Sequence, residues 1–113
     1  MSHSSELLKG TLKTIVLKLL ADHQKLYGYE ITQKVKELTS DRILITEGAL
    51  YPVLHSLEAD KLVTTEIEYI GKRMRKHYRL SKKGALMAKQ KVNEAAGFIE
   101  SLIILLNLPT KLA

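Results

Sequence analysis

The sequence of 113 residues predicts a mainly α-helical chain with a small β-hairpin, arranged as a winged helix-turn-helix with a long C-terminal helix. Three observations favour this class. Three short helical patterns come first, two alternating segments joined by a glycine turn follow, and a heptad pattern of apolar residues ends the chain. We place one unit over residues 1–80 and the C-terminal helix with a short tail over residues 81–113.

The first two helices are predicted from the spacing of apolar side chains. Residues 5–22 carry leucine, isoleucine and valine at steps of three and four, which is typical of a helix with one buried face. A tight connection follows at Gly28, because glycine accepts backbone angles that larger residues resist. The second helix is expected over residues 28–38, with Ile31, Val35 and Leu38 buried.

The third helix is expected to begin near Thr46, whose hydroxyl can accept a hydrogen bond from the free backbone donors at the start of a helix. It should run to about Asp60. Pro52 cannot donate to the carbonyl of Gly48, so we expect a bent or late-starting first turn. The inward side chains are those of Leu50, Leu54 and Leu57.

A β-hairpin is predicted next, with strands over residues 62–70 and 75–80 and a turn between them. Alternation places His77 and Arg79 on the outer face, where Arg79 is as well suited to an ion pair with Glu66 or Glu68 as to a DNA contact. The inner face is expected to carry Val63, Thr65, Ile67, Tyr69, Tyr78 and Leu80.

The last helix should start after Ser81 and run to about Asn107, a length of about 40 Å at 1.5 Å per residue. Its far end, residues 102–106, is apolar all the way round, so it must be covered on more than one side. We therefore predict a homodimer built on this helix. The alternative is that the helix folds back on the first helix of the same subunit. The expected dimer interface comprises Leu8, Leu12, Val92, Ala95, Ala96, Ile99, Leu102, Ile103 and Leu106.

Basic charge is concentrated in one segment. Of 18 lysine and arginine residues, nine lie between Glu68 and Glu94, where no acidic residue occurs. The other nine face twelve acidic residues, so the whole formal charge of +6 comes from that segment. Such a concentration suits a polyanionic partner, although a short charge run is often only a solvated face.

Double-stranded DNA is the predicted polyanion, because a winged helix inserts its third helix into the major groove and contacts the backbone with its hairpin. Tyr51 is as well suited to packing against the neighbouring helix as to contacting a phosphate. The third helix lacks the arginine or asparagine that most often recognises bases, so the wing should supply most of the affinity. The candidate DNA-binding residues are Tyr29, Thr46, Glu47, Gly48, Ala49, Tyr51, His55, Lys72, Arg73, Arg75 and Lys76.

Four motifs resemble the PadR family of bacterial transcriptional regulators, in its smaller subgroup, whose C-terminal part is a single helix. They are LLKGTL at residues 7–12, YGYEI at 27–31, EGALYPVL at 47–54 and RKHYRLS at 75–81, and the match extends to Gly84. The resemblance implies a dimeric winged-helix repressor, bound to a two-fold-symmetric operator and released by a small molecule or another signal. Ala49 stands where the family commonly has threonine, which removes a hydroxyl from the expected DNA contact.

Other functions find little support in the sequence. The four histidines lack second ligands at suitable spacing, and no catalytic grouping is visible, so we expect no metal, no cofactor and no enzyme. The short polar N-terminus and the lack of a long apolar run predict a cytoplasmic protein without membrane attachment. An effector pocket between subunits is an expectation, with close helix packing as its alternative. A competing function is a protein-interaction module whose basic hairpin binds an acidic protein.

Overall fold

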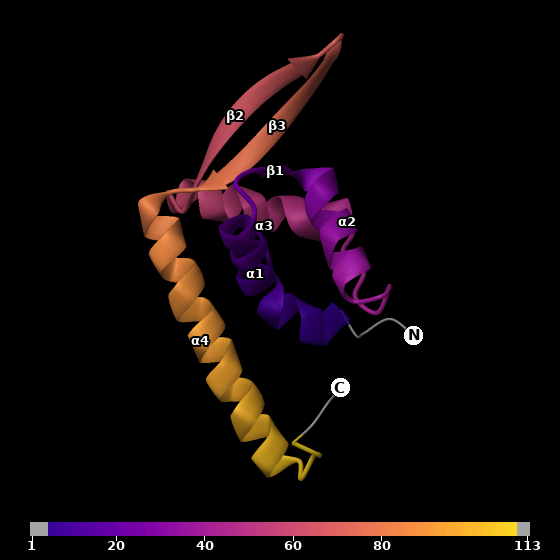
Figure 1. Cartoon of the computed structure of the whole chain (residues 1–113), viewed down its shortest axis with the longest axis vertical. Coiled ribbons are helices and arrows are strands. Elements are labelled where there is room, and N and C mark those ends of the chain that lie inside the picture. Colours follow the sequence, from indigo (N-terminus) through magenta and orange to yellow (C-terminus); the bar gives the residue numbers. More distant parts are fainter. Residues whose placement is uncertain (1–4, 111–113) are drawn as a thin grey trace.

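The computed structural model describes residues 5–110 and confirms the winged helix-turn-helix (Figure 1). Three helices form a compact body, a hairpin projects from one end, and a long helix runs along the other side. The elements are α1 (Ser5–Asp22), β1 (Leu26–Tyr27), α2 (Gly28–Leu38), α3 (Glu47–Ala59), β2 (Val63–Ile70), β3 (Arg73–Leu80) and α4 (Lys82–Leu105).

The core lies where the apolar faces of α1, α2 and α3 meet, close to the base of the hairpin. Its largest fully buried side chains are those of Val16, Leu17, Ile31, Leu50, Leu54, Leu57 and Tyr78. The prediction for Leu38 is wrong, because this side chain is 71% exposed at the end of α2. The chain turns at Thr39, whose hydroxyl donates to the Val35 carbonyl and accepts from the Ile43 N–H, so Ile43 packs on the core instead.

Helix α3 begins as the cap residue predicts. The Thr46 hydroxyl accepts a hydrogen bond from the Ala49 N–H at 3.1 Å, and the helix starts at Glu47. The expectation of a late start is therefore wrong. Pro52 is the sixth residue of α3, so its missing N–H leaves the Gly48 carbonyl without an intrahelical donor at a residue that is exposed to solvent.

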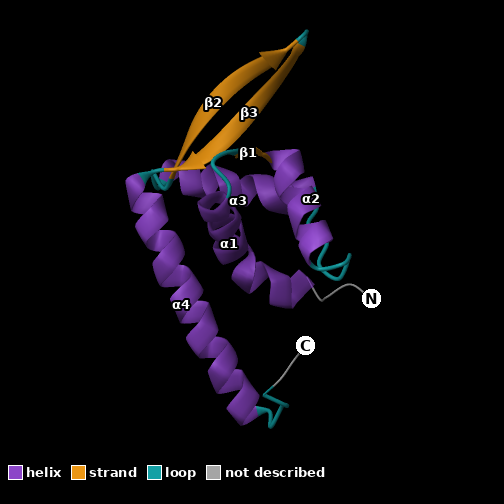
Figure 2. Ribbon diagram, viewed as in Figure 1, coloured by secondary structure: helices purple, strands orange, loops and turns teal. Residues whose placement is uncertain are grey.

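Strands β2 and β3 form an antiparallel hairpin, called the wing below, that projects from the helical body (Figure 2). Its turn is only Gly71 and Lys72, two residues shorter than expected, and Gly71 adopts a positive φ of 64° that glycine tolerates well. Ile67 and Tyr69 are exposed rather than inward, because the outer half of the wing extends beyond every helix that could cover it.

A third strand, β1, pairs with β3 and was not predicted. Two residues are too short to show alternation, so the sequence carries no signal for it. Leu26 lies opposite Tyr78 and Tyr27 opposite His77. This pairing covers His77, which is 7% exposed and not outward as predicted. Its Nδ1 lies 3.3 Å from a carboxylate oxygen of Glu68 but makes no hydrogen bond.

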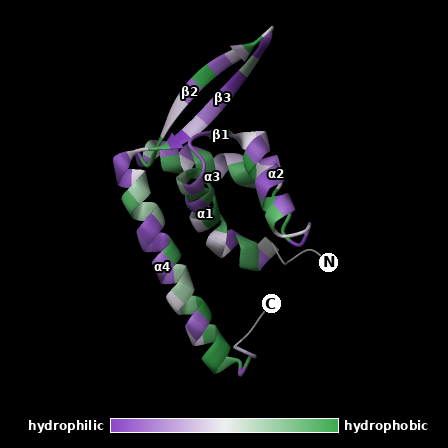
Figure 3. Ribbon diagram, viewed as in Figure 1, coloured by the Kyte–Doolittle hydropathy of each residue, from purple (hydrophilic) through white to green (hydrophobic). Residues whose placement is uncertain are grey.

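Helix α4 is capped by Ser81, whose hydroxyl accepts from the Gly84 N–H and donates to the Lys61 carbonyl. Its first half packs on α1 through Ala88, which is buried. Its last turns diverge from α1 and are strongly apolar (Figure 3), with Leu105 78% exposed. Within residues 5–110, no helix combines the length and apolar character needed to cross a membrane.

Candidate nucleic-acid interface

The first part of the candidate interface is the exposed start of α3. Thr46, Glu47, Gly48 and Ala49 are all solvent-accessible there, and His55 is exposed two turns further along. Tyr29, near the start of α2, is 55% exposed. The small side chains at positions 48 and 49 leave the backbone of α3 uncovered, so a ligand can approach it closely.

The second part is the wing, whose four predicted cations fall into two pairs. Lys72 and Arg73 lie at the turn, exposed and without an ion-pair partner among the described residues. Arg75 and Lys76 lie nearer the body and are already engaged. The Arg75 guanidinium is 4.4 Å from the centre of the Tyr27 ring, and Lys76 Nζ is 3.4 Å from a carboxylate oxygen of Glu58. We call residues 71–73 the wing tip.

Acidic residues neutralise the base of the wing and leave its tip cationic. Glu66 on β2 is 3.5 Å from Lys25 and 3.8 Å from Arg79. Arg79 therefore forms the ion pair that the sequence left as one of two alternatives. Glu58 on α3 accepts from Lys76 and, at 3.5 Å, from the Thr65 hydroxyl, which ties the wing to α3.

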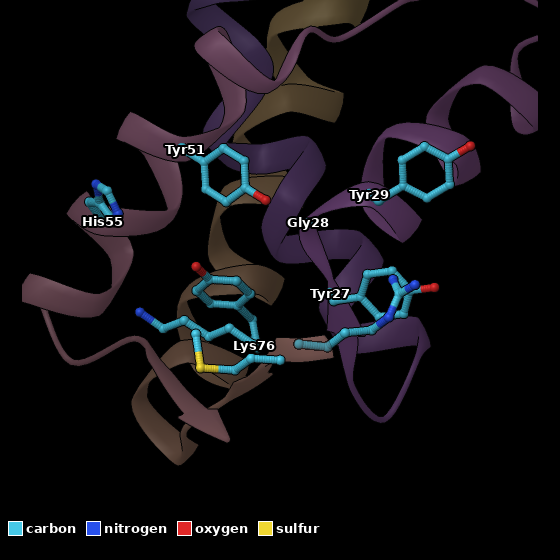
Figure 4. A pocket seen from close by; sticks show the side chains of 9 residues that line it. Tyr27, Gly28, Tyr29, Tyr51, His55 and Lys76 are labelled. Atoms are coloured by element: carbon cyan, nitrogen blue, oxygen red, sulfur yellow. The ribbon is translucent and has the colours of Figure 1, made fainter. Parts of the chain in front are cut away.

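Between these two parts lies a hollow of about 330 Å³. It opens between the start of α2, one side of α3 and the β3 strand (Figure 4). Tyr51 is half-buried at its edge and its hydroxyl points toward Gly28, which agrees with the packing alternative for this residue, whereas the phosphate contact stays a prediction. The lining residues are Tyr27, Gly28, Tyr29, Tyr51, His55, Met74, Arg75, Lys76 and Tyr78.

Tyr78 anchors the floor of this hollow. Its side chain is buried, and desolvation raises the pKa of its phenol, with smaller contributions from Tyr51 and Glu58. A phenol is neutral and a hydrogen-bond donor at neutral pH, and the raised pKa extends that state to higher pH. The phenol therefore adds no negative charge to a surface that already carries Arg75 and Lys76.

A second surface lies between α1, α2 and α4, where an apolar depression of about 440 Å³ is lined by Ile15, Leu19, Val35, Val92, Ala95, Ala96 and Ile99, among others. It brings together four of the residues predicted for the dimer interface. Of the rest, Leu8, Leu102 and Ile103 are half-buried and Leu106 is exposed. Leu12 differs, because it is 5% exposed and its side chain is already covered by the chain's own core.

No group of three histidine, aspartate or glutamate side chains able to hold a metal occurs within the part of the chain that the structure describes.

Comparisons with known proteins agree with this geometry. Residues 16–90 match the model of the transcriptional regulator PadR-like family. The transcriptional regulator Rv3488 of Mycobacterium tuberculosis is 33% identical over 79 residues, 70% of either chain. A transcriptional regulator from Clostridium thermocellum superimposes with a TM-score of 0.76 at 27% identity, over 94% of this chain and 99% of that one.

A PadR family transcriptional regulator from Eggerthella lenta superimposes with a TM-score of 0.78 at 27% identity, over 92% of this chain and 88% of the other. The family match covers α2, α3 and the wing, which are the elements that carry the candidate interface. By its residues, its fold and these matches, the chain belongs to the PadR-like family of transcriptional regulators.

Proposed function

We propose that the protein is a homodimeric, sequence-specific DNA-binding repressor that an effector releases from its operator. Two observations carry this proposal: the cationic wing tip, which projects from the helical body (Figure 1) and has no ion-pair partner among the described residues, and the exposed start of α3. A duplex that contacts both receives α3 in its major groove and the wing tip on its backbone.

The wing tip then contributes affinity, and α3 contributes base recognition. Lys72 and Arg73 supply charge to phosphates, which gives affinity with little dependence on sequence. The exposed Glu47 and His55 side chains are the base-facing groups of α3, since a carboxylate accepts a hydrogen bond from the cytosine amino group and an imidazole can donate or accept. Specificity thus rests on few contacts, with a share from DNA shape.

The homodimer is supported by the exposed apolar end of α4. Ile104, Leu105 and Leu106 are each more than half exposed, which is costly for a helix that remains in water. Pairing two such helices covers these side chains and positions two α3 helices on one duplex. The half-sites of the operator are then about 34 Å apart and related by a two-fold axis.

The effector is proposed to bind the apolar depression beside α4, because Ala95 and Ala96 leave space there next to the proposed dimer interface. A ligand at this position can change how α4 lies on α1, and with it the distance between the two wings. Apolar lining of this kind suits a small hydrophobic molecule.

The test is selection of bound fragments from the source genome, followed by affinity measurements on the enriched sequence. Enrichment of a two-fold-symmetric site is expected. Glu47→Ala and His55→Ala should then change the preference between bases, whereas Glu37→Ala, an exposed position on α2, should not. Failure to enrich any duplex, together with capture of an acidic protein, would replace this proposal with the protein-interaction module.

A further inference from the structure

We propose that the hollow between α2, α3 and β3 binds one backbone phosphate of the operator, and that Gly28 keeps the Tyr51 hydroxyl in place to contact it. This inference rests on the proposed function and deepens it. It assigns a role to the hollow whose walls are formed jointly by α2, α3 and the β3 strand of the wing.

The chemistry of the lining selects an anion. Among the residues that the structure describes, no carboxylate lines the hollow, while four phenols, the Arg75 guanidinium and the Lys76 ammonium do. Phenols and guanidinium groups donate hydrogen bonds, and bonds from such donors to an ionised acceptor are short and strong. Lys76 shares its charge with Glu58, and Arg75 lies over the Tyr27 ring, so both cations are already held near the hollow before a ligand arrives.

The position of the hollow indicates that the anion is a phosphate of the DNA backbone. Its walls come from α3 through Tyr51 and His55, and from the wing through residues 74–76. A duplex that contacts both α3 and the wing tip must carry its backbone across the space between them. At about 330 Å³ the hollow is near the lower end of the range for small-molecule sites, roughly 300–1,000 Å³, and its lining combines aromatic rings and a methionine with the Arg75 and Lys76 cations. A phosphate group therefore fits it better than a drug-sized organic ligand does.

Gly28 explains how Tyr51 reaches this position. A methyl group at residue 28 would lie 2.6 Å from the Tyr51 hydroxyl oxygen and 3.0 Å from the ring carbon that bears it. The first distance is too short for two atoms that are not bonded, so any larger residue would displace the hydroxyl. Gly28 has no positive φ, and space for Tyr51 is what requires glycine here. Gly28 is therefore a positioning residue that acts through Tyr51.

The experiment uses the full chain and the operator isolated by genomic selection. Each phosphate of one half-site is replaced in turn by an uncharged methylphosphonate, and affinity is measured for four proteins: wild type, Tyr51→Phe, Gly28→Ala and Tyr69→Phe. The last is a matched control, because Tyr69 is an exposed phenol on the wing outside the hollow.

Wild type should bind about tenfold more weakly at one phosphate position, the loss expected for one hydrogen bond to a charged group. On unmodified DNA, Tyr51→Phe and Gly28→Ala should each lose about the square of that factor, because the substitution removes the contact in both half-sites of the homodimer. At the critical phosphate they should lose little more, since the contact is already absent. Tyr69→Phe should keep the full wild-type penalty at that position.

Thermal stability separates a positional effect from unfolding. Gly28→Ala must shift the Tyr51 ring, because the hydroxyl oxygen and the nearest ring carbons would lie 2.6–3.3 Å from the added methyl group. Its melting temperature is therefore compared with that of Tyr51→Phe, which keeps the ring and removes only the hydroxyl. A variant that binds DNA weakly while keeping its melting temperature supports the proposal.

Two outcomes would overturn the inference while leaving the proposed function intact. One is that the penalties of Tyr51→Phe and of every methylphosphonate simply add. The other is that inorganic phosphate, titrated without DNA and followed by tyrosine fluorescence, binds wild type tightly and Tyr51→Phe not at all, which would make the hollow a site for a free anion. Failure to select any operator would instead remove the proposed function itself.

Discussion

The wing and the end of α4 are both exposed to solvent, but exposure is favourable for the charged side chains of one and unfavourable for the apolar side chains of the other. The wing tip is cationic, so its side chains are well solvated and its exposure costs little. The last turns of α4 are apolar, and each Å² that a partner covers stabilises the assembly by about 25 cal/mol. The two surfaces suit the two proposed partners: a polyanion, whose binding should weaken with salt, and a second subunit, whose binding should not.

The largest effect is expected when charged side chains are placed on the apolar surface of α4. Ile99→Glu with Leu102→Glu should give a monomer, since the charges cannot be buried without partners. Operator affinity should fall about 100-fold or more, because linking two binding modules contributes that much. Light scattering and gel retardation measure the two effects. Leu86→Glu, at a leucine of α4 that is 71% exposed, is the matched control and should stay dimeric. A dimeric double variant would show that the subunits meet elsewhere.

Removing charge from the wing tip should have a smaller effect on DNA affinity, and the effect should be the same for all DNA sequences. Lys72→Ala with Arg73→Ala should weaken binding to operator and random DNA alike. The slope of log affinity against log salt should become shallower by about 1.8 for each subunit, at about 0.9 per lost phosphate contact. Lys82→Ala with Lys89→Ala removes the same charge from α4 and should leave the slope nearly unchanged. Equal slopes for the two double variants would mean that net charge matters and the wing tip does not.

Substitutions where α4 meets the base of the wing should change the free energy of unfolding rather than DNA affinity. At Gly84 an added methyl group would overlap the Leu62 carbonyl oxygen, where α4 meets the base of the wing. Gly84→Ala should lower the free energy of unfolding by about 1–3 kcal/mol, as overpacking of a filled site does. Gly97→Ala, with open space around it on the same helix, should raise it by about 0.5–1 kcal/mol. Denaturant unfolding of both variants decides whether Gly84 is required for close packing.

The smallest expected effect concerns Tyr78, beneath the cationic face. Its folded pKa is raised above 10.0, so the unfolded chain loses the phenolic proton first as the pH rises. The stability that Tyr78 contributes is complete below pH 10 and falls above it. The difference in unfolding free energy between wild type and Tyr78→Phe should therefore shrink with rising pH in the alkaline range. A difference that stays constant there would contradict the burial of the phenol.

Much of the fold could be predicted because its signals are local. The spacing of Leu50, Leu54 and Leu57 and the cap at Thr46 locate α3 without reference to any other element. Ser81 does the same for α4. The predictions failed where burial depends on another element. Leu38 has a helical position but no neighbour to cover it, and His77 is covered by a two-residue strand that leaves no periodic pattern.

For the candidate site, too, local features could be predicted from the sequence and contacts between elements could not. By itself the sequence determined which segment is cationic, which helix end is apolar and which family motifs are present, because composition and short spacing suffice for these. Only the tertiary structure decided that, within residues 5–110, Lys72 and Arg73 have no ion-pair partner while Arg75 and Lys76 are engaged, and that Gly28 faces the Tyr51 hydroxyl. Those relations join residues far apart in the chain, and the distance between two such side chains is set by packing rather than by spacing in the sequence.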